Sequence, residues 1–286
     1  MLMSIFKFHH QGLNAALRAL ILSVYLAPFA AADAVREQNE QFPAGMKHCG
    51  TGKAASVITG DRFQLKDGSM VSLAEIKAPE YWPPGAPYKS WPLGLVAKTA
   101  LTSMIQNETL EFFCNRKIKS AQGALLTHVR TSQGLWVQRA LVKAGYAYFM
   151  PHGQRPQLAS RLRAAEAEAR VQGRGIWSHE SLGIKRADGD GLRPGWFQII
   201  VGNVTSEAKR KDRMYLNFGA DWSLDFTIEI PKHLYRRFAE ITDGKDGFLG
   251  KTIEVRGWVE WAGGPKIILE FADQLIILPD GTGQSR

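Results

Sequence analysis

Cysteine is scarce in this sequence, which contains two cysteines among 286 residues. Two isolated cysteines exclude a disulfide-rich scaffold, and because no histidine stands at ligand spacing to either of them, a structural zinc site is not indicated. Short-period internal repeats are also missing, so nothing indicates a repeat architecture. Hydrophobic residues make up 45% and charged residues 22% of the chain, which is typical of a globular protein. A chain of this length is expected to hold more than one domain.

Long hydrophobic runs are missing too, apart from a short one near the N-terminus. Residues 19–32 read ALILSVYLAPFAAA and follow the basic residues Lys7 and Arg18. Together with small residues around Ala32, this pattern predicts a secretory signal peptide over residues 1–34. The run is short and interrupted by Pro28, which argues against a membrane span, although an uncleaved anchor is the alternative. No cysteine stands at the cleavage site to carry a lipid. We therefore expect an exported protein, either periplasmic or secreted.

The charge of the chain is distributed unevenly. Residues 46–180 carry 18 basic and 9 acidic residues, whereas residues 194–280 carry 11 basic and 13 acidic residues. The positive charge therefore belongs to the first part of the mature chain. A basic surface favours the binding of polyanions such as nucleic acid or anionic lipid. The alternative is that these charges only keep a solvent-exposed face soluble and bind no partner.

The order of predicted elements divides the chain. After a lead-in at 35–54, residues 55–180 read as strands followed by helices, and residues 181–195 form a linker rich in Gly, Asp and Pro. A second domain is expected at 196–280, followed by a tail at 281–286. Turn signals at Asp67–Gly68, a cap at Ser90 and a stop at Gly145 bound the elements of the first domain. Its predicted strands lie at 57–58, 62–65, 70–76, 109–114 and 125–131, and its predicted helices at 90–105, 135–144 and 157–171. In the third helix the predicted buried stripe is Leu158, Leu162, Ala165 and Ala169.

Four motifs in three separated stretches resemble the staphylococcal-nuclease (thermonuclease) family. Residues 57–80, VITGDRFQLKDGSMVSLAEIKAPE, resemble the opening strands and the Pro-Glu corner of that family. Residues 140–147, ALVKAGYA, and 162–178, LRAAEAEARVQGRGIWS, are similar to its second and third helices and the Ile-Trp-Ser that follows. The resemblance covers about residues 55–180 and implies a β-rich α+β fold, a five-stranded OB-type barrel with three helices.

The second domain is similar to the OB domain that follows some bacterial thermonuclease-like domains. Its expected order is three strands at 197–205, 213–218 and 224–230, a helix at 232–241, and two strands at 252–261 and 266–271. Such domains can stack bases on strand aromatics. Because this domain is slightly acidic, packing is favoured over stacking for its aromatic residues. These residues are Tyr215, Phe218, Trp222, Trp258 and Trp261.

The resemblance implies a phosphodiesterase site made of a calcium ion held by carboxylates, a glutamate that activates water, and two arginines. Asp61 stands at the position of the principal calcium ligand, and Glu80 at that of the catalytic glutamate. Lys77 stands where a second calcium-ligand aspartate is expected, which argues against a bound calcium. The two arginine positions carry Ser72 and Ala124.

These replacements predict an impaired or absent activity, so that the first domain would bind nucleic acid or another phosphate-rich ligand. The alternative is a working calcium-dependent nuclease in which Arg62, Lys77, His128 or Arg130 replaces the missing cations. His128 is expected at a strand edge. A third reading is a non-catalytic scaffold in the cell envelope that binds proteins. A metal-free, salt-bridged cluster of Arg62, Lys77, Asp61 and Glu80 is expected in the first case. It is equally open that Asp61 and Glu80 only satisfy backbone donors at turns.

The resemblance also implies that the strands carrying Cys49 and Cys114 are neighbours. Since export places the chain in an oxidising compartment, we expect a Cys49–Cys114 disulfide. Two buried free thiols are the alternative.

Overall fold

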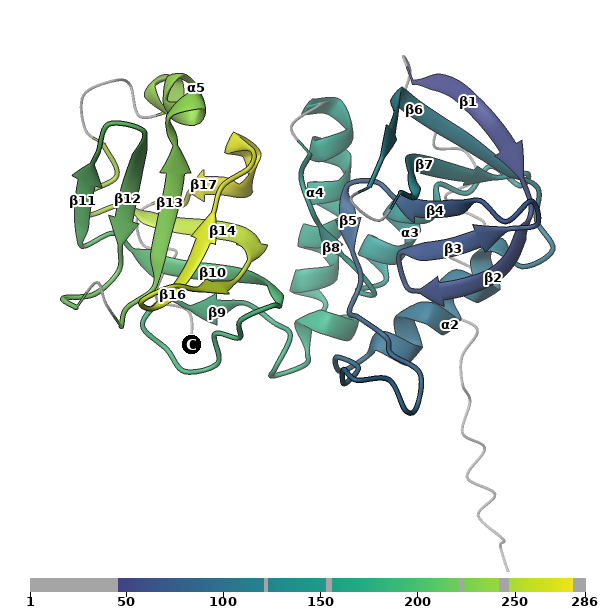
Figure 1. Ribbon diagram of the computed structural model, residues 1–286, viewed down its shortest axis with the longest axis horizontal. Helices are drawn as coiled ribbons and strands as arrows, with labels where there is room; N and C mark the ends of the chain where they lie inside the picture. Colours follow the sequence, from purple (N-terminus) through teal and green to yellow (C-terminus); the bar gives the residue numbers. More distant parts are fainter. Residues whose placement is uncertain (1–45, 121–122, 153–155, 222–223, 242–246, 280–286) are drawn as a thin grey trace, which may run out of the picture.

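The computed structural model describes residues 46–279 except 121–122, 153–155, 222–223 and 242–246. The predicted signal peptide, most of the lead-in, the tail and Trp222 lie outside these residues. The described chain is β-rich, with four sheets and four α-helices. It forms a first half (residues 46–180) and a second half (residues 181–279), which lie side by side in Figure 1.

The first half is built on a six-stranded sheet with the order β1-β6-β7-β4-β3-β2. Neighbouring strands are antiparallel except β4 and β7, which are parallel. Its strands are β1 (Lys47–Gly52), β2 (Ala54–Thr59), β3 (Arg62–Leu65), β4 (Met70–Leu73), β6 (Leu110–Lys119) and β7 (Leu125–Thr131). A separate two-stranded ladder pairs β5 (Ile76–Lys77) with β8 (Tyr148–Phe149).

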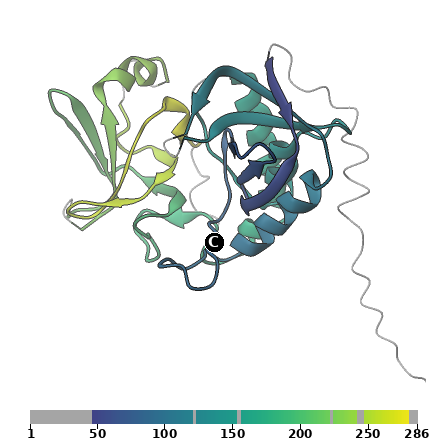
Figure 2. The ribbon, with the colours of Figure 1, turned by 45° about the vertical axis from the view of Figure 1, so that its right-hand side comes forward.

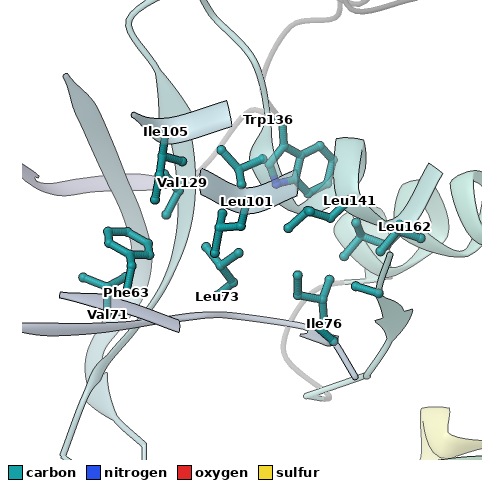
Figure 3. Packing of buried hydrophobic residues seen from close by; sticks show 14 of the residues in the cluster. Phe63, Val71, Leu73, Ile76, Leu101, Ile105, Val129, Trp136, Leu141 and Leu162 are labelled. Atoms are coloured by element: carbon teal, nitrogen blue, oxygen red, sulfur yellow. The ribbon is translucent and has the colours of Figure 1, made fainter. Parts of the chain in front are cut away.

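Three helices cover this sheet: α2 (Gly94–Ile105), α3 (Val137–Lys143) and α4 (Pro156–Val171). The stripe predicted for the third helix is confirmed, because Leu158, Leu162, Ala165 and Ala169 are all buried. Strand and helix side chains meet in one hydrophobic core, part of which is drawn in Figure 3. Residues of that core include Phe63, Val71, Leu73, Leu101, Val129, Leu141 and Leu162.

A disulfide joins Cys49 of β1 to Cys114 of β6, with the two Cα atoms 6.0 Å apart. The two strands are neighbours in the sheet, and β1 is an edge strand of the ladder. The crosslink therefore fastens the edge strand to the strand that it pairs with.

The second half contains two sheets, with the orders β17-β14-β10-β9 and β11-β12-β13-β16-β15. Their residues pack around a second core that includes Ile200, Leu216, Ile228, Ile253 and Leu275. The strands are β9 (Lys185–Arg186), β10 (Phe197–Asn203), β11 (Ser206–Lys209), β12 (Arg213–Asn217), β13 (Thr227–Pro231), β14 (Thr252–Trp258), β15 (Glu260–Trp261), β16 (Pro265–Ile268) and β17 (Leu275–Ile277). A short helix, α5 (Tyr235–Ile241), follows β13.

A buried ion cluster joins the two halves. The Arg256 side chain on β14 is 1% exposed, and its guanidinium lies 2.9 Å from a Glu166 carboxylate oxygen on α4. The same guanidinium donates a hydrogen bond to the Phe149 carbonyl oxygen at 2.8 Å. Arg170 on α4 in turn contacts Glu254 of β14 at 2.6 Å. Helix α4 thus lies on the side of the first half that faces the second, as Figure 1 shows, and its Glu166 and Arg170 are paired with β14.

Two details differ from the sequence prediction. The hydroxyl of Ser90 does not cap the helix: it accepts a hydrogen bond from the Trp82 backbone N–H and donates one to the Trp82 carbonyl, closing the loop before α2. The expected linker at 181–195 packs against its neighbours. Its residues Lys185 and Arg186 form β9, parallel to β10, and the carbonyl of Leu182 accepts a hydrogen bond from the Tyr148 hydroxyl at 2.7 Å. Within the described residues, no helix combines the length and apolar character that crossing a bilayer requires.

Candidate functional site

A short turn and the end of a short strand bring the candidate site together. The turn between β2 and β3 carries Asp61, and the chain leaving β5 carries Lys77 and Glu80. Gly60 lies where the turn presses against α2. A Cβ atom at that position would stand 2.6 Å from the Cβ of Ala97 and 2.7 Å from that of Ala78. Glycine is therefore required for the close approach that sets Asp61 beside the Lys77–Glu80 segment.

The carboxylate of Asp61 is fully engaged by the protein. The Thr59 hydroxyl donates to its Oδ1 at 2.6 Å, and the Ala78 backbone N–H donates to its Oδ2 at 3.0 Å. The Lys77 Nζ lies 2.8 Å from the same Oδ2. The residue is only 5% exposed, so these partners replace water as its solvation.

Lys77 links Asp61 to Glu80. Its Nζ is 2.8 Å from Asp61 Oδ2 and 2.6 Å from Glu80 Oε1. The second oxygen of Glu80 faces Arg62, whose Nη2 lies 3.4 Å away. Cations and carboxylates therefore alternate along a short chain, and we call Asp61, Arg62, Lys77 and Glu80 the charge cluster. Of the readings left open by the sequence, the salt-bridged cluster is the arrangement present.

The electrostatics of the charge cluster favour its ionised form. Burial by itself raises the pKa of Asp61, but the charge and hydrogen bond of Lys77, with the Thr59 and Ala78 donors, outweigh it and hold that pKa below its usual range. Burial likewise lowers the pKa of Lys77, and the two facing carboxylates outweigh it and raise that pKa. Lys77 therefore remains an ammonium ion at neutral pH.

The residues present do not fit a calcium ion. Calcium takes six to eight oxygen ligands with several negative charges among them. Here the Lys77 ammonium stands between the Asp61 and Glu80 carboxylates at contact distance from both. Across the ranges that the structure describes, no group of three or more His, Cys, Asp or Glu side chains could hold a metal ion.

The two positions expected to hold arginines carry small side chains. Ser72 of β4 pairs with Arg62 across the antiparallel ladder, so the two side chains share one face of the sheet. Its hydroxyl supplies no positive charge there. Ala124 is buried just before β7, where its backbone N–H donates to the Ser120 hydroxyl and its carbonyl accepts from the Ser120 N–H.

His128 and Arg130 belong to other contacts. The expectation that His128 lies at a strand edge is wrong, because β7 is an interior strand and the imidazole is buried. Its Nε2 lies 3.6 Å from Glu75 Oε2, and Trp136 Nε1 donates to its Nδ1 at 3.3 Å. Arg130 pairs with Glu111 at 2.7 Å. The structure thus brings Asp61, Arg62, Lys77, Glu80 and Ser72 together and bonds His128 and Arg130 elsewhere.

The sequence placed Trp258 among the aromatic residues of the second domain, but it did not predict that Trp258 or Trp91 lies beside the charge cluster. Lys77 Nζ lies 6.0 Å from the ring centroid of Trp91 and 5.7 Å from that of Trp258. Trp91 begins the segment that leads into α2, and Trp258 ends β14 in the second half. Trp258 follows Lys77 by 181 residues (258 − 77), so no local sequence pattern links the two, and the docking of the halves makes them neighbours.

In a comparison with protein-family models, residues 70–179 match the family described as staphylococcal nuclease homologue. This part of the chain is therefore a domain like those of the staphylococcal-nuclease family. Lys77 and Glu80 lie within the matched residues, whereas Asp61 precedes them. No curated protein matches the chain.

Proposed function

Taking residues 70–179 as a staphylococcal-nuclease-like domain, we propose that this protein binds nucleic acid or another phosphate-rich ligand without hydrolysing it. The single observation that carries the proposal is the position of Lys77, whose Nζ bridges the Asp61 and Glu80 carboxylates at 2.8 and 2.6 Å. An ammonium ion tethered in this way competes with a metal ion for Asp61 and holds Glu80 in ion pairs. A glutamate so engaged is a poor base for an attacking water.

The missing arginines support the same proposal. Cleavage of a phosphodiester develops negative charge on the phosphate, which positioned cations stabilise. Ser72 and Ala124 supply no such charge. Removing one charged stabiliser costs a factor of about 10² to 10³ in rate, so the loss of both predicts little turnover.

Binding, in contrast, needs only accessible positive charge. Residues 46–180 carry twice as many basic as acidic residues. Within the charge cluster the Arg62 side chain remains 26% exposed and can donate to a phosphate oxygen from outside the cluster. The basic half can therefore attract a polyanion even though its cluster is internally paired.

We further propose that each half is an OB-type domain and that the protein is exported. Support for the first comes from the mixed sheet in which β4 runs parallel to β7, and from a second half whose strands surround one core. Support for export comes from the N-terminal pattern of the sequence and from the Cys49–Cys114 disulfide, since such bonds persist in oxidising compartments. These observations support a location in the periplasm and secretion to the exterior equally.

A working nuclease is the second candidate, because Arg62 stands beside Glu80 with its side chain partly exposed. That arrangement would supply one cation next to a carboxylate. It leaves the position between Asp61 and Glu80 filled by Lys77, which is why binding without cleavage is preferred. A protein-binding scaffold is the third candidate, and the near-neutral second half suits it best.

One assay separates these candidates. The protein, expressed as the full chain and purified from the compartment where it accumulates, is incubated with labelled DNA and RNA, single-stranded and duplex, with calcium or with a chelator. We expect binding at low salt and no products under either condition, with Glu80→Gln giving the same result. Calcium-dependent cleavage that disappears in Glu80→Gln would establish a nuclease. The absence of binding to every nucleic acid at low salt would favour the scaffold.

A further inference from the structure

Two groups of aromatic side chains lie near the charge cluster, one where the two halves meet and one in the loop before Trp91. Trp91 of the first half and Trp196 of the second are stacked, with ring centroids 4.5 Å apart and planes inclined by 10°. Trp258 meets Trp91 edge-on at 6.1 Å, and Trp82 lies 5.0 Å from Tyr88 in the loop that leads to Trp91. We call these five residues the aromatic seam.

The aromatic seam contains both buried and exposed rings. Trp91 is buried. Tyr88 is 64% exposed and Trp258 40% exposed, although large rings gain most from burial. In Figures 1 and 2 the loop between β5 and α2 and the segment around β9 lie at the same end of the molecule, between the halves. The loop that ends at Trp91 and the chain that leads to Trp196 are therefore neighbours at the contact between the two halves.

Positive side chains accompany the rings. Arg193 lies 4.8 Å from the Trp196 ring, and Lys98 lies 4.5 Å from the ring of Tyr81, the residue before Trp82. Lys77 adds a third cation at 5.7 Å from Trp258. The Trp91 backbone N–H donates to the Glu80 carbonyl at 2.8 Å, so the aromatic seam is continuous with the charge cluster.

We propose that the aromatic seam binds the bases of a single-stranded nucleic acid, while Lys98, Arg193 and Arg62 contact its phosphates. This rests on the proposed function, which it deepens by adding a site that needs both halves. Stacking rings interleaved with cations are what single-strand binders use, and every base offers a face to stack. In a duplex those faces are already covered by neighbouring base pairs. A neutral sugar would use the rings but gain nothing from the cations.

The test is a binding titration of the full chain with labelled single-stranded dT20, a duplex of the same length, heparin and cellohexaose at several salt concentrations. We expect dT20 to bind more tightly than the duplex. Trp258→Leu, which keeps an apolar side chain but removes the ring, should weaken dT20 binding about tenfold at an unchanged salt slope. Trp258→Phe, which keeps a ring, should stay within about threefold of the parent. Lys98→Gln should reduce the salt slope by about one.

Leu249→Ala serves as the control, since Leu249 is an exposed apolar residue that follows α5, and the variant should bind like the parent. Thermal melting of each variant verifies folding. If dT20, duplex and heparin bind alike and Trp258→Leu has no effect, the aromatic seam is not a base-binding site, while the proposed function stands. Binding of cellohexaose in preference to dT20 would replace this inference with a glycan site. If no polyanion binds, both the inference and the proposed function fail.

Discussion

At the scale of the residue, the charge cluster depends on Lys77. A carboxylate as buried as Asp61 is stable in its ionised form only with compensating partners. Thr59 and Ala78 supply hydrogen bonds, and among the residues that the structure describes Lys77 brings the compensating charge to Asp61, at 2.8 Å. The same ammonium holds Glu80, so removing it would leave two carboxylates facing each other with Arg62 as the cation bonded to one of them.

We expect Lys77→Met to lower the free energy of unfolding at pH 7 by about 3 to 5 kcal/mol, the usual result of breaking a buried ion pair. The depressed pKa of Asp61 means that its contribution to stability is present above the unfolded pKa and is lost as pH falls through the folded pKa. The difference between parent and variant should therefore shrink in acid. Urea unfolding at pH 7 and at about pH 2.5, below the ordinary aspartate pKa of 3.8, measures it.

The double variant Asp61→Asn/Lys77→Met serves as the control, because it removes both charges and should recover much of the loss. If the free energy of unfolding of Lys77→Met lies within about 1 kcal/mol of the parent value, the buried pair contributes little to stability.

At the scale of the element, the sequence predicted most of what regular patterns encode. The stripe of α4 followed from 3.6-residue spacing, and β3 and β7 were placed with the bounds that the structure has. β11 was missed because its segment SEAK is polar and mostly exposed, and β17 because it is three residues long. Ser90 has the side chain of a cap, but its nearest backbone partners are those of Trp82.

The candidate site, like the fold, was predictable from the sequence only where a local pattern encodes it. Asp61, Lys77 and Glu80 were found because they lie in segments with recognisable sequences. The position of the Lys77 ammonium between the carboxylates depends on side-chain geometry, and the approach of Trp258 depends on how the halves dock. Neither is encoded in local spacing.

The disulfide between β1 and β6 offers a prediction at this scale. It closes a loop with a sequence separation of 65 residues, so in the chain-entropy model its removal costs about 4 kcal/mol. We expect reduction, or the pair Cys49→Ser/Cys114→Ser, to lower the melting temperature by several degrees and to increase hydrogen exchange in β1 first. Since both cysteines of the chain form this bond, reductant should have no effect on the double variant. An unchanged melting temperature after reduction would contradict the prediction.

At the scale of the whole molecule, the two halves share buried charges. Arg256 and Glu254 come from β14, and Glu166 and Arg170 from α4. Burial acts to raise the pKa of Glu254, but the hydrogen bond from Arg170 and the charges of both arginines outweigh it and lower that pKa to about 2. The contact between the halves is therefore held in part by a carboxylate that must stay ionised, and the aromatic seam depends on that contact.

This predicts acid sensitivity at the contact. A depressed pKa contributes stability that is present above the ordinary value of 4.5 and is lost as pH falls towards about 2. We expect the melting temperature to decline across this window and the fluorescence of the tryptophans in the aromatic seam to change with it. Glu254→Gln should be less stable than the parent at pH 7 and show a flatter decline in acid. If the two proteins follow parallel curves, Glu254 is not responsible.

The central claim is that the Lys77 ammonium occupies the position where a nuclease of this fold would hold its cation. Calorimetric titration of calcium into the full-chain protein at pH 7 tests it most directly, with Lys77→Asp titrated alongside. We predict no saturable binding by the parent up to about 1 mM, the weak end of protein calcium sites, and measurable binding by Lys77→Asp. Saturable binding by the parent at micromolar calcium, abolished by Asp61→Asn, would contradict the account.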